Sequence, residues 1–285
     1  IMPDRSAPFV TARWLADRLG GPSLTVVDGS WYLPSAGRDA EAEYRAGHIP
    51  GAVRFDLDEI ADRSSGLPHM LPSPEAFAAA VGALGISERN TIVVYDGAGL
   101  FSAPRVRWTF RVMGAVDVRI LEGGLPAWVA AGLPLETSGP KPEPEQFVAR
   151  LDRDAVRSLG EMVETAASGT VQIVDARPAD RFRGEAAEPR PGLRSGHIPG
   201  SRNLPASALV ADGRLKAPDV IAGLFAEAGI DLAQPVITSC GSGVTAAILA
   251  LGLETIGADK VALYDGSWAE WGGRADVPIE TGPAR

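Results

Sequence analysis

The sequence predicts two tandem α/β domains, each with a mainly parallel β-sheet flanked by helices. Short β-branched runs alternate with helix-like segments, which is the pattern of parallel sheets with crossover helices. The pentapeptide GHIPG occurs twice, at 47–51 and 196–200, within the same order of elements. The chain has 285 residues, which suits two domains of roughly 100–150 residues each.

Three apolar runs in each half are the expected strands. The first run ends in an aspartate, Asp28 in one half and Asp175 in the other. The second and third runs occupy 91–100 and 118–128 in the first half, and 235–244 and 261–271 in the second. The shared order indicates a tandem duplication.

The helix-like segments between these runs carry start and stop signals. Ser73, followed by proline, has the residue type that opens a helix, and Gly229 and Gly257 have the type that closes one. The stretch between the halves is rich in Pro, Glu and Gly, as is typical of an extended linker. We therefore expect an N-terminal domain over 1–136, a linker over 137–147 and a C-terminal domain over 148–285.

Composition and charge exclude several classes of function. The formal net charge of −9 argues against a nucleic-acid binder, which needs a dense basic face, and against adhesion to anionic lipid. No run approaches the roughly 18 apolar residues of a membrane span. The first residues show no apolar segment of the kind found in a secretory signal. We expect a cytoplasmic protein with no nucleic-acid partner and no membrane partner.

The single cysteine, Cys240, stands between the apolar run PVITS and a glycine-rich turn. One cysteine forbids an internal disulfide and a thiolate zinc cluster. A lone cysteine is often a small buried hydrophobe. This one follows an expected strand, and ligands of α/β sheets bind at the carboxyl ends of strands. Glycines on both sides of Ser242 allow backbone N–H groups to converge on a thiolate or on an anion attached to sulfur.

The first half has Asp96 at the position that matches Cys240 when VVYDGAGLFSA is aligned with ITSCGSGVTA. A carboxylate cannot replace a sulfur nucleophile, and a position needed only for packing would favour Ala, Ser or Val. We therefore predict that the first half is catalytically inactive and that the second half carries the chemistry.

Two familiar kinds of cysteine chemistry fit poorly. A Cys-x5-Arg phosphatase needs arginine six positions after the cysteine to clamp phosphate oxygens, and Ala246 stands there. A cysteine protease needs a histidine base. His48 and His197 lie in the two GHIPG turns, where a shared structural role is expected, so His69 outside the repeat is the remaining candidate.

The ordered set of motifs resembles the tandem-domain rhodanese family. The set comprises the two GHIPG turns, SWYLPSAGRDA, HMLP, FSAPR, RFRGE with EPRPG, and the closing YDGSWAEW, and it covers nearly the whole chain. The loop CGSGVT at 240–245 looks like that of the family's 3-mercaptopyruvate sulfurtransferases, whereas thiosulfate sulfurtransferases usually carry basic residues there. The resemblance implies a five-stranded parallel sheet in each domain and an inactive N-terminal domain.

The resemblance also implies a reaction. Cys240 would take the sulfur of 3-mercaptopyruvate as a persulfide, release pyruvate, and pass the sulfur to cyanide, a small thiol or reduced thioredoxin. No metal or organic cofactor is implied, because sulfur itself carries the chemistry. Arg181 and Arg190 would bind the carboxylate and carbonyl oxygens of the donor, which a planar guanidinium matches in fork geometry. Two solvated surface charges are the alternative.

The same resemblance assigns the rest of the site. Ser242, His69 and Asp58 would form a proton-handling trio across the domain interface, because pyruvate leaves as its enolate and must take up a proton. A histidine that only satisfies an interface is the alternative for His69, and Asp56 and Asp62 lie close to Asp58 in sequence. The loop residues expected to line the donor site are Gly241, Gly243, Val244 and Thr245.

The uncharged loop favours 3-mercaptopyruvate over thiosulfate. Thiosulfate is a dianion whose sulfonate end stays near the cysteine, where basic loop residues would help it. Mercaptopyruvate carries one charge at a distance from its sulfur, where the two arginines can reach it. Two alternatives stay open: a thiosulfate:cyanide sulfurtransferase with an atypical loop, and a non-catalytic module that senses sulfur or redox state.

Overall fold

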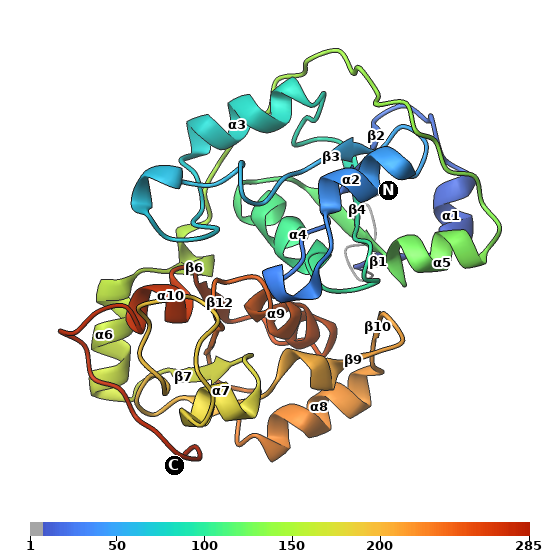
Figure 1. Cartoon of the computed structure of the whole chain (residues 1–285). Helices are drawn as coiled ribbons and strands as arrows, with labels where there is room; N and C mark the ends of the chain where they lie inside the picture. Colours follow the sequence, from blue (N-terminus) through green and yellow to red (C-terminus); the bar gives the residue numbers. More distant parts are fainter. Residues whose placement is uncertain (1–7) are drawn as a thin grey trace. The chain divides into compact units, whose positions relative to one another are not determined.

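The computed structural model describes residues 8–285, which divide into two compact units (Figure 1). The first unit runs to Ala61 and also contains Leu71–Asp152 and Asp212–Arg214. The second unit comprises Asp62–Met70, Arg153–Ala211 and Leu215–Arg285. Each unit thus includes a short segment from the other half of the sequence. The domain limits at 136, 137–147 and 148 stay a prediction.

The first unit contains a five-stranded parallel sheet in the order β1-β5-β4-β2-β3. Its strands are β1 (Phe9–Val10), β2 (Leu24–Asp28), β3 (Val53–Arg54), β4 (Thr91–Tyr95) and β5 (Asp117–Leu121). Its helices are α1 (Ala12–Ala16), η1 (Pro34–Ala36), α2 (Ala40–Ala46), α3 (Pro74–Ala83), α4 (Ala103–Val112) and α5 (Gly124–Ala130).

The second unit repeats this sheet in the order β6-β12-β11-β7-β8, again with all neighbours parallel. Its strands are β6 (Val156–Arg157), β7 (Gln172–Asp175), β8 (Arg202–Asn203), β11 (Val236–Ser239) and β12 (Val261–Tyr264). Its helices are η2 (Arg63–Ser65), η3 (Arg153–Ala155), α6 (Leu159–Ser168), α7 (Ala179–Arg183), η4 (Ala206–Leu209), α8 (Pro218–Glu227), α9 (Ala246–Thr255) and α10 (Ser267–Trp271). A short ribbon pairs β9 (Val210–Ala211) with β10 (Arg214–Leu215). Strand for strand, the two sheets correspond, which confirms the predicted duplication and fold class.

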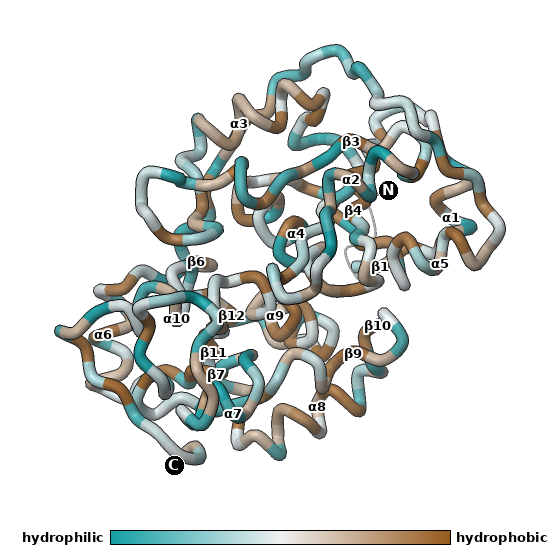
Figure 2. The backbone as a smooth tube through the Cα atoms, in the orientation of Figure 1, coloured by the Kyte–Doolittle hydropathy of each residue, from teal (hydrophilic) through white to brown (hydrophobic). Residues whose placement is uncertain are grey.

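The predicted helix signals lie where the helices begin and end. The Ser73 hydroxyl accepts the Ala76 N–H at the start of α3. Gly229 and Gly257 follow α8 and α9 with φ of +81° and +84°, the left-handed backbone that glycine adopts without strain. Figure 2 shows hydrophobic residues along α8 and α9, and α9 is buried along most of its length. No helix of the described residues has the length and apolar character to cross a bilayer.

The two GHIPG histidines are structural, as predicted. In each unit the histidine backbone pairs with a glutamate near the end of that half. The imidazole stacks on an aromatic ring at a centroid distance of 4.0 or 3.8 Å, and its Nδ1 lies 2.7 Å from the carbonyl oxygen of that aromatic residue. The residues are His48, Glu136 and Tyr44 in the first unit, and His197, Glu280 and Phe182 in the second.

The end of the predicted linker packs on the first unit. Phe147 is 4% exposed, and its ring lies 5.3 Å from Phe77 and 6.4 Å from Phe110 between centroids. The Glu145 N–H donates to the carbonyl oxygen of Gly82 at 2.9 Å. The aromatic side chain of Phe147 is therefore part of the hydrophobic core of the first unit.

Substituting Phe147 tests this packing. Phe147→Ala should lower the free energy of unfolding by about 3–5 kcal/mol, because it removes a buried ring and leaves a cavity. The measurement is urea denaturation followed by tryptophan fluorescence. Val148→Ala is the control, since Val148 is 42% exposed and should change stability by less than about 0.5 kcal/mol. Equal effects of the two variants would contradict a core role for Phe147.

Candidate active site

Cys240 directly follows β11, the central strand of the second sheet, and begins the loop that leads to α9. It is 1% exposed. The cysteine thus lies at the carboxyl end of a parallel strand, as the sequence predicts, where α/β folds bind their ligands.

The loop after Cys240 turns back onto the sulfur. The Gly243 N–H donates to Sγ of Cys240 at 3.0 Å. Gly243 has φ of +84°, a conformation that an L side chain rarely adopts. Val244 is buried and Thr245 directly precedes α9. A backbone N–H aimed at sulfur stabilises a thiolate or a negatively charged group bound to it.

The start of α10 holds the main chain of the same loop. The Cys240 N–H donates to Oγ of Ser267 at 3.1 Å, and the Trp268 N–H donates to the Cys240 carbonyl oxygen at 2.9 Å. The Ala269 N–H donates to the Gly241 carbonyl oxygen at 2.8 Å. Both backbone polar groups of the cysteine are therefore bound within the second unit.

Arg181 and Arg190 lie against Gly241. A Cβ atom on Gly241 would be 3.2 Å from Nη2 of Arg181 and 3.6 Å from Nη1 of Arg190. Both arginines are half-buried. The structure thus brings two guanidinium groups to the residue next to the cysteine, and the absence of a side chain at Gly241 permits their approach.

Arg181 is held by a buried glutamate that the sequence analysis missed. Nε of Arg181 donates to Oε2 of Glu188 at 2.8 Å, and the side chain of Glu188 is 1% exposed. The other oxygen of Glu188 binds Arg177. Glu188 lies between the two predicted arginines in sequence, in RFRGEAAEPR, but nothing in the residue spacing indicates that it bridges Arg181 to a third arginine.

Arg177 connects this glutamate to the sheet and to α10. Its guanidinium donates to both carboxylate oxygens of Asp175 and to the Gly196 carbonyl oxygen, and it lies 4.5 Å from the ring centroid of Trp268. Burial by itself would lower the pKa of Arg177, but the carboxylates of Asp175 and Glu188 outweigh burial and raise it above its ordinary value. A charge this deeply buried persists because it is fully paired.

His69 and Ser242 meet within the second unit. Nδ1 of His69 lies 3.0 Å from Oγ of Ser242, and the two side chains are 4% and 5% exposed. His69 belongs to the segment Asp62–Met70 of that unit, whereas Asp58 belongs to the first unit, where it accepts the Trp31 Nε1–H at 3.2 Å. The structure thus pairs two members of the predicted trio, and the role of Asp58 stays a prediction.

In the first unit, the position that corresponds to Cys240 holds a buried carboxylate. Asp96 follows β4 as Cys240 follows β11, and it is fully buried. Its two oxygens accept N–H groups from Ala98, Phe101, Ser102 and Ala103 at 2.8–3.0 Å. The loop amides are therefore occupied by the protein's own carboxylate.

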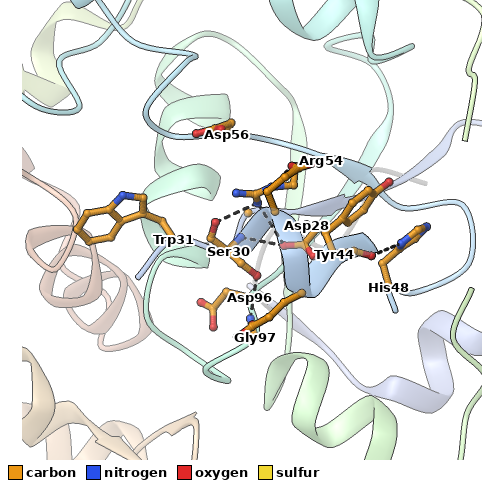
Figure 3. Close-up of polar contacts among 12 residues, drawn as sticks. Asp28, Ser30, Trp31, Tyr44, His48, Arg54, Asp56, Asp96 and Gly97 are labelled. Carbon is orange, nitrogen blue, oxygen red and sulfur yellow. Dashed lines mark hydrogen bonds and ion pairs between the residues drawn. The ribbon is translucent and has the colours of Figure 1, made fainter. Parts of the chain in front are cut away.

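Figure 3 shows the polar contacts around Asp28, Ser30 and Asp96 in the first unit, which differ from those of the second unit. Ser30 stands where the second unit has Arg177; its N–H donates to Asp28 at 2.9 Å and its hydroxyl accepts the Gly97 N–H at 3.0 Å. Burial raises the pKa of Asp28 above its ordinary value, and the bonds from Ser30 and the charge of Arg54 oppose that rise. Over Gly97, which corresponds to Gly241, the nearest group is the hydroxyl of Tyr32, with the ion pair of Arg38 and Glu43 beside it.

Comparisons with known proteins show similarity over nearly the whole chain. A model of the rhodanese-like domain matches the chain twice, at residues 11–131 and 158–274. The chain is 45% identical over 273 residues to the 3-mercaptopyruvate sulfurtransferase of Escherichia coli strain K12, covering 95% of this chain and 97% of that one. It is 43% identical over 271 residues to the thiosulfate sulfurtransferase of Cricetulus griseus, covering 92% and 91%.

A solved structure shares the whole architecture. The crystal structure of SseA from Escherichia coli, described as a 3-mercaptopyruvate sulfotransferase with the rhodanese fold, superposes with a TM-score of 0.86 at 42% sequence identity, covering 93% of this chain and 100% of that one. The rhodanese-like model matches both halves of the chain, and each half contains the same sheet. The two relatives named above align over 97% and 91% of their own length. The chain belongs to the rhodanese family.

Proposed function

We propose that this protein is a 3-mercaptopyruvate sulfurtransferase whose nucleophile is Cys240. The observation that carries the proposal is the juxtaposition of a buried thiol, bound by the Gly243 N–H, with two guanidinium groups at the adjacent Gly241. A thiol alone could take up sulfur from many donors. The arginines add a binding site for a donor that carries a carboxylate.

The reaction has two balanced steps. The Cys240 thiolate attacks the sulfur of 3-mercaptopyruvate, the carbon–sulfur bond breaks, and its electron pair leaves with the enolate of pyruvate. The enolate takes up a proton, and the enzyme keeps the sulfur as a Cys240 persulfide. An acceptor thiolate or cyanide then attacks the outer sulfur and restores the Cys240 thiolate. The acceptors proposed are cyanide, a small thiol and reduced thioredoxin.

The proposed roles follow from position. Arg181 and Arg190 bind the carboxylate and carbonyl oxygens of the donor, and the carbonyl contact favours the enolate that forms when the carbon–sulfur bond breaks. The Ser242 hydroxyl, backed by the His69 imidazole, supplies a proton path to the departing enolate, with Asp58 as the third proposed member. Gly241, Gly243, Val244 and Thr245 shape the pocket for the transferred sulfur.

The choice of donor rests on charge rather than on overall similarity, since relatives named for each donor match the chain at 45% and 43% identity. The loop CGSGVT carries no charged side chain. A dianionic donor would leave its sulfonate beside this loop without a cation from the loop itself. We further propose a cytoplasmic location, because the chemistry requires a free thiol and the cytoplasm keeps thiols reduced.

Intact mass measurement tests the donor directly. Reduced protein incubated with 3-mercaptopyruvate should gain the mass of one sulfur atom, and Cys240→Ser should gain none, since the chain has no other cysteine. Equal or faster loading from thiosulfate would reverse the choice of donor. Loading from neither donor would favour the sulfur- or redox-sensing module.

Removing one guanidinium tests the donor site. Arg190→Ala should raise KM for 3-mercaptopyruvate by one to three orders of magnitude, equivalent to about 1.4–4 kcal/mol, because a charge-assisted contact to the carboxylate is lost. Steady-state kinetics measure this effect. Arg183→Ala is the control, because Arg183 is an exposed arginine of α7, and its KM should stay within about twofold of wild type. An unchanged KM in Arg190→Ala would remove Arg190 from the site.

The bridging glutamate should affect both stability and donor binding. Glu188→Gln should lower the free energy of unfolding by about 3 kcal/mol, because Arg177 loses a charged partner in a buried network. It should also raise KM roughly tenfold, because Arg181 is no longer held in place. Urea denaturation and kinetics measure the two effects. The exposed Glu185→Gln should change neither, and a Glu188→Gln enzyme with wild-type KM would show that Arg181 does not depend on this bridge.

A further inference from the structure

Four described residues other than glycine have φ in the left-handed region: Ser23, His69, Asp212 and Ser267. Two of them, Ser23 and Asp212, are exposed. The other two, His69 and Ser267, are 4% and 0% exposed, and both form a hydrogen bond to the cysteine loop. Left-handed backbone is unfavourable for a residue with a Cβ atom, so its retention at buried positions around one loop points to a function of those side chains.

The Ser267 hydroxyl joins two backbone groups. It accepts the Cys240 N–H at 3.1 Å and donates to the carbonyl oxygen of Tyr264 at 2.9 Å. The Cys240 carbonyl oxygen is bound by the Trp268 N–H at 2.9 Å. With its N–H and C=O both bound, Cys240 has a fixed backbone, and the direction of Sγ depends on one side-chain torsion and on the Gly243 N–H.

The duplicated half shows that the fold can be built without this serine. Gly124 occupies the corresponding position after β5, with φ of +59°, and the Leu125 N–H donates to the Asp96 carbonyl oxygen at 3.1 Å as Trp268 does to Cys240. A Cβ atom on Gly124 would lie 2.5 Å from the Asp96 carbonyl oxygen, so no serine fits there. In the half that carries the cysteine this position holds Ser267, which adopts the strained left-handed backbone and whose hydroxyl accepts the Cys240 N–H.

We propose that Ser267 is a positioning residue for sulfur transfer. Its hydroxyl holds the Cys240 N–H and thereby fixes the approach of Sγ to the donor sulfur. This inference rests on the function proposed above. The effect falls on kcat rather than on KM, because the donor carboxylate is bound by Arg181 and Arg190, whereas Ser267 acts through the main chain of the nucleophile.

The single cysteine allows a direct test of the hydrogen bond. Protein labelled with [15N]cysteine gives one amide signal, that of Cys240. We expect the Cys240 amide to exchange with solvent at least tenfold faster in Ser267→Ala and Ser267→Gly than in wild type. Ser23→Gly is the matched control, because it removes an exposed serine with φ of +59°, and exchange at Cys240 should not change. Wild-type exchange in both Ser267 variants would overturn the proposal.

Kinetics on the same proteins separate positioning from stability. Ser267→Gly suits the left-handed backbone and should fold even where Ser267→Ala does not. At a temperature where circular dichroism shows the protein fully folded, Ser267→Gly should lower kcat at least tenfold with KM within twofold of wild type, and Ser23→Gly should change neither. A folded Ser267→Gly with wild-type kcat would reduce Ser267 to a structural role and overturn the proposal.

Failure of the proposed function gives a different result. The kinetics use 3-mercaptopyruvate or thiosulfate, whichever loads the wild-type protein. If neither loads it, the sulfurtransferase proposal fails, and a positioning role in sulfur transfer fails with it. The exchange measurement needs no donor, and it then still reports whether Ser267 holds the Cys240 N–H.

Discussion

One hydrogen bond defines the loop on which the chemistry depends. In the second unit the N–H of Trp268, the second residue of α10, donates to the carbonyl oxygen of Cys240, which follows the central strand β11. In the first unit the N–H of Leu125, the second residue of α5, donates in the same way to Asp96, which follows the central strand β4. This bond constrains the loop backbone in both halves. The side chain of the residue after the central strand then determines what the loop N–H groups bind. The Asp96 carboxylate binds four loop amides itself, whereas Sγ of Cys240 accepts the Gly243 N–H. The same scaffold therefore makes a filled loop in one half and a reactive thiol in the other.

The charges behind the loop have diverged in the same way. In the second unit a buried Arg177 binds Asp175 and Glu188, and Glu188 in turn holds Arg181 beside Gly241. In the first unit Ser30 replaces that arginine, and Arg54 on β3 approaches the matching aspartate. Buried charges are stable only as paired sets, so a whole network had to change together. The network that holds Arg181, an arginine proposed to bind the donor, is found in the half with the cysteine.

These two differences support the prediction that only the second half is catalytic. A nucleophile needs a fixed backbone, a stabilised thiolate and a substrate held at the correct distance. The start of α10 binds the backbone of Cys240 through Ser267 and Trp268, and the Gly243 N–H donates to its Sγ. The two arginines beside Gly241 are the groups proposed to provide the third. The left-handed backbone of Ser267 and His69 is consistent with a site in which local strain is retained for function.

The sequence by itself determined the duplication, three strands in each half and the place of Cys240 at the end of one of them, because strand periodicity, GHIPG spacing and turn residues are local signals. The resemblance of short motifs also pointed to Arg181, Arg190 and His69 as candidates. Only the tertiary structure decided which of these side chains meet. The contact between His69 and Ser242 spans 173 residues, and the bridge through Glu188, the packing of Phe147 and the Ser267 hydroxyl depend on the path of the chain in space. Residue types and spacings do not specify that path, so such contacts can be identified only in the folded structure.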